Sequence, residues 1–458
     1  MVKNKIMQTD TIIIGAGLTG LTTAFYLQRA SKDFLVLEKA GTYGGAIQTE
    51  IEKDFLYEKG PNTGVVGTPE TAELFEDLGD KIKTEIAGDE VNKRYILKNG
   101  KWEALPSGLM QGIKTPLFTT KDKFRLLAEP FRKKGTNPHE TLADLVKRRM
   151  GQSFLDYAID PFILGVYSGD PAYLVPKYAL PKLYNLEQNY GSFIGGAIKK
   201  GFAKKDEREK KATRKVFSVE GGLANLTKAL YQSVGEEHFL FNAENINVQP
   251  ENNYFTVTFT QNGEKKSIQA KKIITAAGAY ALPEILPFVP TEQMQKISNL
   301  KYARVVEVVL GFNNWQGFPL DGFGGLIPFI ENRDVLGYLF LSAFLKNRAP
   351  KQGALITLFL GGVRKDYIND YSDEEIRKIV EKETLDLMKL SNFKPDLFKI
   401  FRHKQAIPQY GADSGERFKT IEEIEKQYKG LIIGGNLKDG IGMADRIKQG
   451  RMLAERIS

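Results

Sequence analysis

The chain has 458 residues, of which 42% are hydrophobic and 26% charged, a composition typical of a globular protein with two or three domains. It contains no cysteine, which excludes disulfides, thiolate metal sites, iron–sulfur clusters and cysteine nucleophiles. The net charge of +9 favours acidic partners such as anionic lipids or acidic small molecules, and we expect no nucleic-acid partner.

The N-terminus carries the clearest pattern. Thr11–Ile14 is a short apolar run typical of a buried parallel strand, and Gly15-Ala16-Gly17-Leu18-Thr19-Gly20 and a helix-spaced apolar face follow it. Phe34–Leu37 predicts a second buried strand, which ends at Glu38. This order of strand, turn, helix, strand and terminal acid predicts a dinucleotide-binding unit rather than an ordinary glycine turn.

Residues of this unit have separate physical roles. Gly15 allows a tight turn, Gly17 lets backbone N–H groups approach a pyrophosphate, and Gly20 lets the helix pack closely on the strand. Glu38 can accept hydrogen bonds from the ribose hydroxyls. Gly44-Gly45, just beyond the second strand, can approach the same pyrophosphate, and the N-terminal position of the unit is like that of two-domain flavoproteins. FAD is therefore predicted in preference to NAD.

Local signals predict further elements in the first half. Thr68-Pro69 predicts the start of a helix over 70–79, and Asn99-Gly100 predicts the turn of a hairpin over 94–105. From about 116 to 215 the pattern is mainly helical and basic, interrupted by a segment with proline and glycine at 160–171. Its last part, 199–215, carries nine basic residues against three acids.

The second half predicts mostly strands. A helix over 223–234 precedes them, and Ser372–Glu375 is a capping box that opens a helix to about 390. A last buried strand, 431–433, leads into a glycine loop and a final helix from about Met443, whose N-terminus can stabilise negative charge on a flavin. The predicted strands between these helices are 245–248, 254–260, 267–270, 273–274, 305–311, 337–342 and 355–360.

These elements predict an α/β chain, α+β overall, in which a Rossmann-like FAD-binding domain is discontinuous. We expect three domains: the FAD-binding domain, a mixed-sheet substrate domain, and a helical, membrane-associating domain. The expected ranges are 1–90, 215–299 and 401–458 for the FAD-binding domain, 91–115 and 300–400 for the substrate domain, and 116–214 for the helical domain.

Several longer runs carry a more specific signal. Asp160–Pro171 (DPFILGVYSGDP) and Ala406–Tyr410 (AIPQY) are the most discriminating of them, and Glu58–Thr63, Phe217–Gly222 and Gly434–Met443 accompany them. With these runs the chain resembles the oxygen-dependent protoporphyrinogen/coproporphyrinogen oxidase family of the flavin monoamine oxidase-like superfamily. The resemblance covers nearly the whole length.

The resemblance implies non-covalent FAD and a porphyrinogen held between the cofactor domain and a second domain. It implies an enzyme of heme biosynthesis that oxidises protoporphyrinogen IX to protoporphyrin IX in three flavin reductions, each followed by reoxidation with oxygen and release of hydrogen peroxide. Oxidation of coproporphyrinogen III to coproporphyrin III is the alternative, because the sequence does not decide between two and four propionates.

By position, the resemblance also implies roles for single residues. Arg94 would pair with a substrate propionate, Leu326 and Leu339 would hold one side of the ring, and Phe359 would stack on the other side. Gly169 would offer its backbone carbonyl to pyrrole N–H groups. The implied cofactor-binding residues are Gly15, Ala16, Gly17, Leu18, Thr19, Gly20, Glu38, Lys39, Gly44, Gly45, Gly60, Pro61, Asn62, Thr63, Ile246, Ala276, Asn436, Ile441, Gly442 and Met443, of which Asn62, at the flavin edge, also counts as a substrate residue.

The chain departs from the family at Thr42, where relatives usually have an arginine two residues before the Gly-Gly pair. The remaining chemistry needs placement and an electron acceptor, with no nucleophile, metal or catalytic dyad. None is visible in the sequence, since His139, His238 and His403 lie far apart and lack metal-ligand spacing.

Two other readings share the fingerprint. An amine oxidase or carotenoid desaturase has the same architecture, but amine oxidases place aromatic residues beside the C-terminal flavin loop, and 434–445 contains none. A non-catalytic binding protein of the dissociation-inhibitor type need not keep Glu38 or the flavin-facing C-terminal loop, and this chain has both.

The cellular setting follows from what the sequence lacks. No run approaches the roughly 18 apolar residues that span a bilayer, and 1–10 is too short and polar for a signal peptide. We expect a cytoplasmic protein that associates peripherally with the cytoplasmic face of the cell membrane, and a homodimer is a further expectation. The basic run 199–215 is either a plain solvated loop or part of an anionic-lipid surface. The other candidates for that surface are Phe124, Leu126, Leu127, Phe131, Arg132, Lys133 and Lys134.

Overall fold

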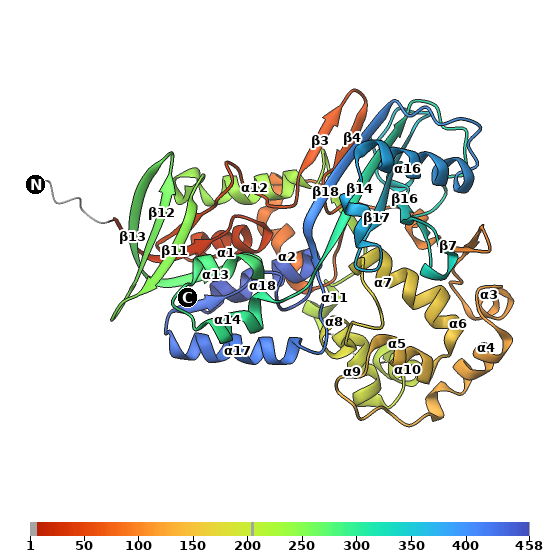
Figure 1. Cartoon of the computed structure of the whole chain (residues 1–458), viewed down its shortest axis with the longest axis horizontal. Helices are drawn as coiled ribbons and strands as arrows, with labels where there is room; N and C mark the ends of the chain where they lie inside the picture. Colours follow the sequence, from red (N-terminus) through yellow and green to blue (C-terminus); the bar gives the residue numbers. More distant parts are fainter. Residues whose placement is uncertain (1–6, 203–205, 458) are drawn as a thin grey trace, which may run out of the picture.

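The computed structural model describes residues 7–202 and 206–457. Figure 1 shows a sheet covered by helices at the left, a second sheet at the upper right, and a group of short helices at the lower right. The predicted fold class is confirmed, because a mostly parallel, helix-covered sheet stands beside a mixed sheet and a helical unit.

The first sheet has the strand order β10-β2-β1-β13-β12-β11, with β19 paired to β13. Strands β10, β2, β1, the end of β13 and β19 run parallel, whereas β11, β12 and the start of β13 pair antiparallel. The bounds are β1 Met7–Ile14, β2 Phe34–Leu37, β10 Phe239–Leu240, β11 Glu244–Pro250, β12 Phe255–Gln261, β13 Glu264–Thr275 and β19 Leu431–Ile433.

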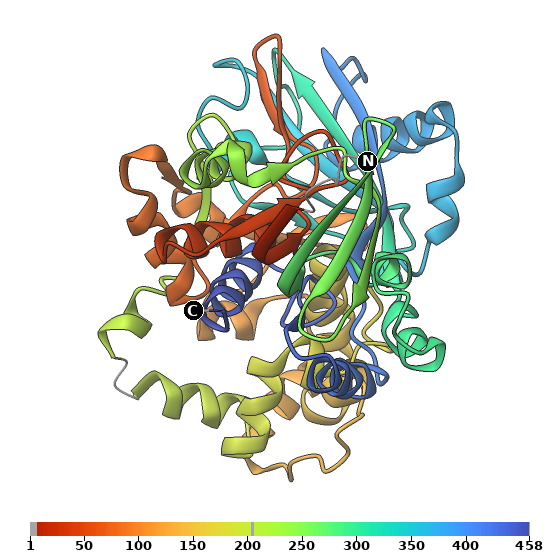
Figure 2. The same ribbon diagram turned by 90° about the vertical axis from the view of Figure 1, so that its left-hand side faces the viewer.

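Alternate residues of these strands face two helical layers. Ile13 and Val36 pack with one set of helices, and Ile12 and Leu35 pack with the other. In Figure 2 the C-terminal helix α18 (blue) lies beside α1 (red), so the first and last helices of the chain pack on the same face of the sheet. The first layer is α1 Leu18–Arg29, α2 Pro69–Leu78, α12 Ala224–Val234 and α18 Met443–Glu455; the second is α13 Leu282–Ile285, α14 Thr291–Ser298 and α17 Ser414–Gln427.

The second sheet has the order β18-β14-β17-β16-β15-β7-β8 and is antiparallel except between β15 and β7. One face packs on α16, Asp373–Leu387, through residues such as Val308, Leu358 and Val380. Short helix α15, Leu341–Phe344, packs at the other face. The strands are β7 Arg94–Lys98, β8 Lys101–Ala104, β14 Tyr302–Phe312, β15 Gly324–Leu326, β16 Val335–Leu339, β17 Ala354–Gly361 and β18 Leu397–Pro408.

Two small sheets join the larger units. The hairpin of β3, Thr49–Glu52, and β4, Phe55–Glu58, leads from the first sheet toward the second. Strand β9, Val216–Val219, pairs with both β5, Gly64–Val65, and β6, Thr84–Ile86.

A buried ion pair holds the helical unit together. Arg149 and Glu129 are both fully buried, and Arg149 Nε donates to Glu129 Oε1 at 2.6 Å. Glu129 also accepts hydrogen bonds from Ser192 Oγ and from the backbone N–H of Phe193, at the start of α10. The helices of this unit are α3 Leu109–Lys114, α4 Thr120–Leu127, α5 Leu142–Arg149, α6 Gln152–Phe154, α7 Asp160–Tyr167, α8 Pro176–Ala179, α9 Pro181–Tyr190 and α10 Phe193–Phe202. The next helix, α11 Glu207–Lys210, packs on α2 instead.

Several local predictions are confirmed and others are corrected. The hairpin turn at Asn99-Gly100, with both residues at positive φ, and the capping box of Ser372 and Glu375 are as predicted. Two predicted strands, 267–270 and 273–274, are one continuous strand, β13. The predicted interruption at 160–171 is wrong over its first eight residues, because Pro161 occupies the first turn of α7, where proline is tolerated.

The turn between β1 and α1 contains glycines with two different roles. A Cβ added at Gly20 would lie 1.9 Å from the Gly15 carbonyl oxygen, so helix and turn touch there. A Cβ at Gly17 meets nothing within 4 Å beyond its chain neighbours, and Gly17 has φ −73°, which any residue adopts. Gly20 is therefore required by packing, and Gly17 leaves open space above the turn.

We predict opposite outcomes for these two positions. Gly20→Ala should destabilise the protein by about 3 kcal/mol, because the turn and the helix must separate, and should lower the melting temperature of the flavin-free protein by at least about 5 °C. Gly17→Ala should melt within about 2 °C of wild type, yet lose flavin at least about 10-fold more readily on dialysis, since its methyl group fills the expected phosphate position. Equal flavin retention in Gly17→Ala and wild type would contradict the assignment.

Candidate active site

Glu38 closes the glycine turn from the second strand. Its carboxylate accepts hydrogen bonds from the backbone N–H of Ala16 at 2.7 Å and of Ala40 at 2.9 Å. Lys39 beside it is exposed, so its ammonium group is free to reach a ligand at the strand end. The acid is thus held at the carboxyl end of β2, where a dinucleotide ribose binds in this type of unit.

The Gly44-Gly45 pair meets the first turn directly. Gly44 N–H donates to the Ala16 carbonyl at 2.8 Å, and a Cβ on Gly45 would lie 3.2 Å from the Gly17 Cα. Leu18 and Thr19 are buried in the first turn of α1, while Thr42 is exposed ahead of the pair. Two glycine segments therefore border the open space at Gly17, and they leave room for a pyrophosphate at the N-terminus of α1.

Two more predicted cofactor residues lie along the same sheet. Ala276 follows β13, and its N–H donates to the Ile14 carbonyl at 2.8 Å, which places it directly across from Gly15. Ile246 is buried in β11, at an irregularity in the pairing of β11 with β12 between Glu244 and Asn247. Both positions are at or near the nucleotide half of the expected site.

The C-terminal loop is held in place by two buried side chains to which the sequence analysis assigned no role. Arg446 donates to the carbonyls of Gly435, Lys438 and Gly440. The Tyr410 hydroxyl donates to the Asn436 carbonyl at 2.6 Å and lies 3.1 Å from the Gly440 carbonyl. Burial lowers the pKa of Arg446 and raises that of Tyr410. Tyr410 gives the AIPQY run a physical role, because it fixes the loop that leads into α18.

The remaining cofactor candidates border this loop. Asn436 is half-buried, and its side-chain oxygen accepts a hydrogen bond from the Tyr302 hydroxyl at 3.0 Å. Ile441, Gly442 and Met443 form the entry to α18, with Gly442 exposed and Met443 buried. Across from them, Gly60, Pro61, Asn62 and Thr63 form the loop after β4, in which only Asn62 is buried.

The second sheet brings the four predicted ring and propionate residues onto one face. Residues opposite each other across neighbouring strands share a face, and the register gives two adjacent rows. One row contains Phe359, Gly337 and Leu326; the other contains Leu339, Gly324 and Arg94. This is the face opposite α16.

These residues are less buried than their neighbours. Leu326, Leu339 and Phe359 are each partly exposed, although the residues before and after them in the strands are buried. Arg94 is exposed, with its guanidinium 5.4 Å from the centre of the Phe323 ring. Within the described residues Arg94 has no acidic partner, so its charge is available to a ligand.

Helix α7, the first part of the discriminating run, docks on this face. The Asp160 carboxylate accepts hydrogen bonds from Arg364 at 2.5 Å and from the Phe329 N–H at 2.8 Å. A Cβ on Gly165 would lie 2.5 Å from Leu326 Cδ2, so Gly165 is one of the residues of the run that meet the sheet. Gly169 lies beyond the helix end, where a Cβ would be 2.5 Å from the buried Gln409 Oε1.

A third group was not visible from the sequence. Asn62 Nδ2 donates to Glu307 Oε1 at 2.7 Å, and His403 Nε2 lies 2.9 Å from Glu307 Oε2. Glu307 is fully buried on β14, in the register row of Phe359, and burial raises the pKa of Glu307. No motif links these three residues, since 245 residues separate Asn62 from Glu307 and 96 separate Glu307 from His403.

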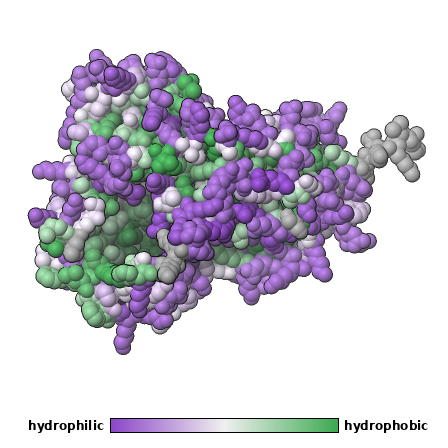
Figure 3. Space-filling model, turned by 180° about the vertical axis from the view of Figure 1, so that it is seen from behind, coloured by the Kyte–Doolittle hydropathy of each residue, from purple (hydrophilic) through white to green (hydrophobic). Residues whose placement is uncertain are grey.

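A largely apolar cavity of about 830 Å³ adjoins α7 and the start of α18. Phe162 and Val166 of α7 and the predicted cofactor residues Ile441 and Gly442 line it. Seen from behind, the surface is hollowed between the two right-hand lobes of Figure 1, and hydrophobic side chains line the hollow (Figure 3).

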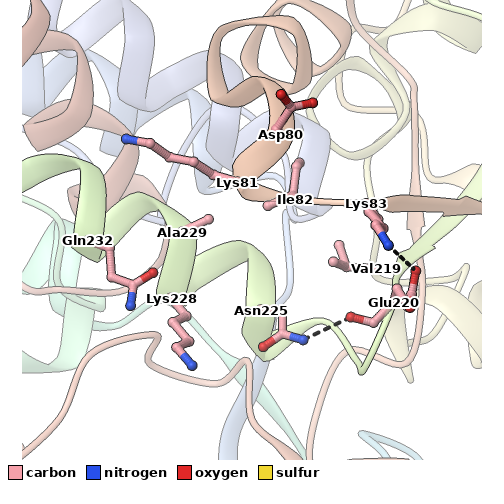
Figure 4. A pocket seen from close by; sticks show the side chains of 10 residues that line it. All are labelled: Asp80, Lys81, Ile82, Lys83, Val219, Glu220, Asn225, Lys228, Ala229 and Gln232. Carbon is pink, nitrogen blue, oxygen red and sulfur yellow. Dashed lines mark hydrogen bonds and ion pairs between the residues drawn. The ribbon is translucent and has the colours of Figure 1, made fainter.

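A polar depression of about 320 Å³ lies elsewhere, between α12 and the segment 80–83 (Figure 4). An ion pair of Lys83 with Glu220 at 3.7 Å and a hydrogen bond from Asn225 to the Glu220 carbonyl cross it. It contains none of the predicted site residues, and the apolar cavity is therefore the better site candidate.

Comparison with known proteins agrees with this geometry. The family model for flavin-containing amine oxidoreductase matches residues 18–457. Protoporphyrinogen oxidase 2 of Arabidopsis thaliana is 27% identical over 97% of this chain and 93% of its own length. Coproporphyrinogen III oxidase of Bacillus subtilis (strain 168) is 24% identical over 96% of each chain.

Solved structures show the same fold. A crystal structure from Exiguobacterium sp. 255-15, of a protein to which protoporphyrinogen oxidase activity has been attributed, superposes with a TM-score of 0.81 at 20% identity, over 98% of both chains. Putrescine oxidase bound to putrescine superposes with a TM-score of 0.69 at 14% identity, over 98% of this chain and 99% of its own. With the family model covering nearly the whole chain, the protein belongs to the flavin-containing amine oxidoreductases and is an FAD-dependent oxidase.

Proposed function

We propose that the protein is an oxygen-dependent porphyrinogen oxidase. The proposed reaction takes protoporphyrinogen IX to protoporphyrin IX in three two-electron steps, in which three molecules of oxygen are reduced to three of hydrogen peroxide. Coproporphyrinogen III is the alternative substrate, because the curated relatives carry both names at similar identity, 27% and 24%.

The arrangement of the second sheet is the observation that carries this proposal. Phe359 and Arg94 are three strands apart, which at about 4.8 Å per strand is a span of about 14 Å. Leu326 and Leu339 lie between them, and glycines alternate with these side chains in both rows. An apolar surface that ends at a guanidinium without an acidic partner among the described residues suits a tetrapyrrole with carboxylate side chains far better than a small amine.

The chain's own residues supply placement and electrostatics. FAD, when bound, supplies the hydride acceptor. Leu326, Leu339 and Phe359 would hold the ring, Arg94 would fix its orientation, and the N-terminus of α18 would favour negative charge at the flavin. Gly169 stays a candidate for contact with pyrrole N–H groups, and Gly165 is a second candidate because it meets Leu326.

An amine oxidase is the main competing function, and the putrescine oxidase neighbour shares its fold with this chain. Residues 434–445, which contain no aromatic side chain, argue against an aromatic cage for an amine beside α18.

A homodimer stays a prediction.

The decisive experiment offers the purified yellow protein protoporphyrinogen IX, coproporphyrinogen III and putrescine side by side. We expect porphyrin fluorescence to rise with at least one porphyrinogen, with one hydrogen peroxide released per two electrons, and no peroxide with putrescine. Peroxide from the amine alone would replace this proposal by the competing function.

Arg94→Ala tests the propionate contact. Guanidinium pairs with carboxylate through two parallel hydrogen bonds, which contribute about 1.5–3 kcal/mol, so kcat/KM should fall about 10- to 100-fold. Flavin content and melting temperature should stay near wild type, because Arg94 is exposed. Steady-state kinetics with both porphyrinogens measure the effect.

Two controls frame this result. Arg94→Lys keeps the charge but not the paired geometry, and should recover only part of the loss. Arg377→Ala removes another arginine stacked on a phenylalanine, with its guanidinium 4.5 Å from the Phe398 ring centre, but on the outer helix α16. Arg377→Ala should keep wild-type kinetics; equal effects of Arg94→Ala and Arg377→Ala would assign Arg94 a structural role only.

We also propose that the helical unit docks on an anionic membrane surface. None of the helices in 7–202 and 206–457 is long and apolar enough to cross a bilayer. Hydrophobic side chains gather over the helical lobe at the lower left of Figure 3. The exposed apolar residues of α3, α4 and the turn after α4 are Met110, Ile113, Phe124, Leu127 and Phe131, with Lys114, Lys121, Lys133 and Lys134 nearby.

The basic run 199–215 contributes less than its sequence suggests. Arg208 pairs with Glu70 and Glu73, and Lys211 pairs with Glu76, so helix α2 neutralises part of the run. Leu126 is also half-buried rather than exposed, and Lys204 and Lys205 lie outside the described residues. The apolar surface of α3 and α4 is therefore the main contact.

Sedimentation with vesicles of phosphatidylglycerol tests the docking surface. The wild type should co-sediment at low salt and be released as salt rises, because each lysine near the surface contributes about 1 kcal/mol and is screened. Replacing Phe124 and Phe131 by serine should weaken binding at least about 10-fold, since each buries a large apolar side chain. Ile51→Ser, at a 69% exposed position on the β3–β4 hairpin, is the matched control and should bind like wild type.

A further inference from the structure

Three residues from three parts of the chain form a buried polar group between the two sheets. Asn62 lies in the loop after β4, Glu307 in the middle of β14 and His403 on the edge strand β18. Glu307 is 0% exposed, Asn62 is 5% exposed, and the His403 side chain is 26% exposed. The group thus extends from the loop expected at the flavin toward solvent.

The hydrogen bonds fix the orientation of the Asn62 amide. Its NH2 group donates to the Gly60 carbonyl at 2.9 Å and to Glu307 Oε1 at 2.7 Å, which uses both of its hydrogens. Asn62 Oδ1 is buried and has no hydrogen-bond partner among the described residues. A buried acceptor without a partner costs about 1–3 kcal/mol, so a ligand N–H group that binds it would recover that free energy.

The fold does not require these polar groups. Phe359 and Phe401 flank Glu307 in the register, and Val305 and Val309 share its face of β14. An apolar residue at 307 would fit these surroundings, and buried charged groups are often replaced by apolar ones without loss of stability. By contrast, Glu383 of α16 is also buried, but it pairs with Arg333.

We propose that Glu307 and His403 form a positioning pair that fixes the Asn62 amide with its oxygen toward an N–H group of the bound flavin or substrate, and that protonation of the pair switches this orientation off. The proposal rests on the proposed function only where the N–H donor is a pyrrole. A carboxylate offers acceptors only, so it holds the amide by its NH2 side. A protonated Glu307 can donate to Asn62 Oδ1 instead and releases the amide.

The charged surroundings set the direction of the pH effect. His403 and Asn62 donate to Glu307, and the Gly60 N–H lies near it. Glu58, an acid that interacts with Glu307, is paired with Arg348 at 3.4 Å. Burial raises the pKa of Glu307, and the contacts with His403 and Asn62 oppose this shift. Glu307 therefore takes up its proton at a higher pH than an exposed glutamate, and the fixed amide is lost as the pH falls.

The experiment compares Glu307→Gln and His403→Gln with two matched controls. Glu383→Gln removes a buried, ion-paired carboxylate of α16, and His139→Gln removes an exposed histidine. Each holoenzyme is titrated upward from the pH range in which an exposed glutamate takes up its proton, because burial raises the pKa of Glu307. The readouts are the visible spectrum of the bound flavin, the affinity for protoporphyrin IX and coproporphyrin III, and kcat/KM.

We expect the flavin spectrum, the porphyrin affinity and kcat/KM of the wild type to change with pH, and both control variants should show the same pH dependence. Glu307→Gln should abolish it and lower kcat/KM about 3- to 30-fold at neutral pH. His403→Gln should move its midpoint to higher pH, because the carboxylate loses the donor that stabilises it. A purely structural role would change the melting temperature and leave these pH profiles in place.

The arms distinguish the sources of the N–H group. If Glu307→Gln loses the pH dependence of the flavin spectrum in the absence of substrate, the N–H group belongs to the flavin. This result holds even if neither porphyrinogen is oxidised. Loss of pH-dependent porphyrin affinity alone assigns it to a pyrrole. Identical pH profiles of all readouts in wild type, His403→Gln and Glu307→Gln would overturn the proposal, and His403→Gln decides alone should Glu307→Gln not fold.

Discussion

The parallel pairing of the first sheet is the constraint on which the rest of the molecule depends. Parallel strands cannot be joined by a tight hairpin, so the chain must leave the sheet and return to add each strand. It leaves after β2 and returns at β10 and β13, then leaves again and returns at β19. The two long excursions build the helical unit and the second sheet. Both start at the carboxyl edge of the first sheet, where a dinucleotide binds, and end at its amino edge, where the next parallel strand begins.

Sequence reasoning worked where a signal is local. The glycine turn with Glu38, the Asn99-Gly100 hairpin and the capping box at Ser372 each depend on a few adjacent residues, and the structure contains all three. Strand β18 was missed because its apolar and polar residues do not alternate regularly, as they do in a strand with one buried face, and most of its residues are only partly buried. Helix α7 was not predicted, because Pro161 was interpreted as an interruption of the helical pattern.

The buried polar groups show why the site could be only partly predicted. Glu307 meets residues 245 and 96 positions away in the sequence, so only the folded chain reveals these contacts. Arg446 meets carbonyls only 6 to 11 positions away, but no motif marks it. The two also differ in kind. Arg446 donates hydrogen bonds to backbone carbonyls of one loop, which is a structural role. Glu307, in contrast, contacts the neutral amide of Asn62 on one side and the partly exposed imidazole of His403 on the other. Only the second arrangement leaves an acceptor, Asn62 Oδ1, without a partner.

The same contrast separates the two faces of the second sheet. The face on α16 is closed by apolar packing, as at Val308, Leu358 and Val380, and needs no ligand. The opposite face keeps Leu326, Leu339 and Phe359 partly exposed and Arg94 without an acidic partner among the described residues. Each Å² of exposed apolar area costs about 25 cal/mol. The free energy of unfolding is therefore lower than it would be if this face were covered by apolar packing. A flat, acidic ligand would bury the exposed apolar area and form an ion pair with Arg94. Burial of this area, which does not stabilise the free protein, would then contribute to the free energy of binding.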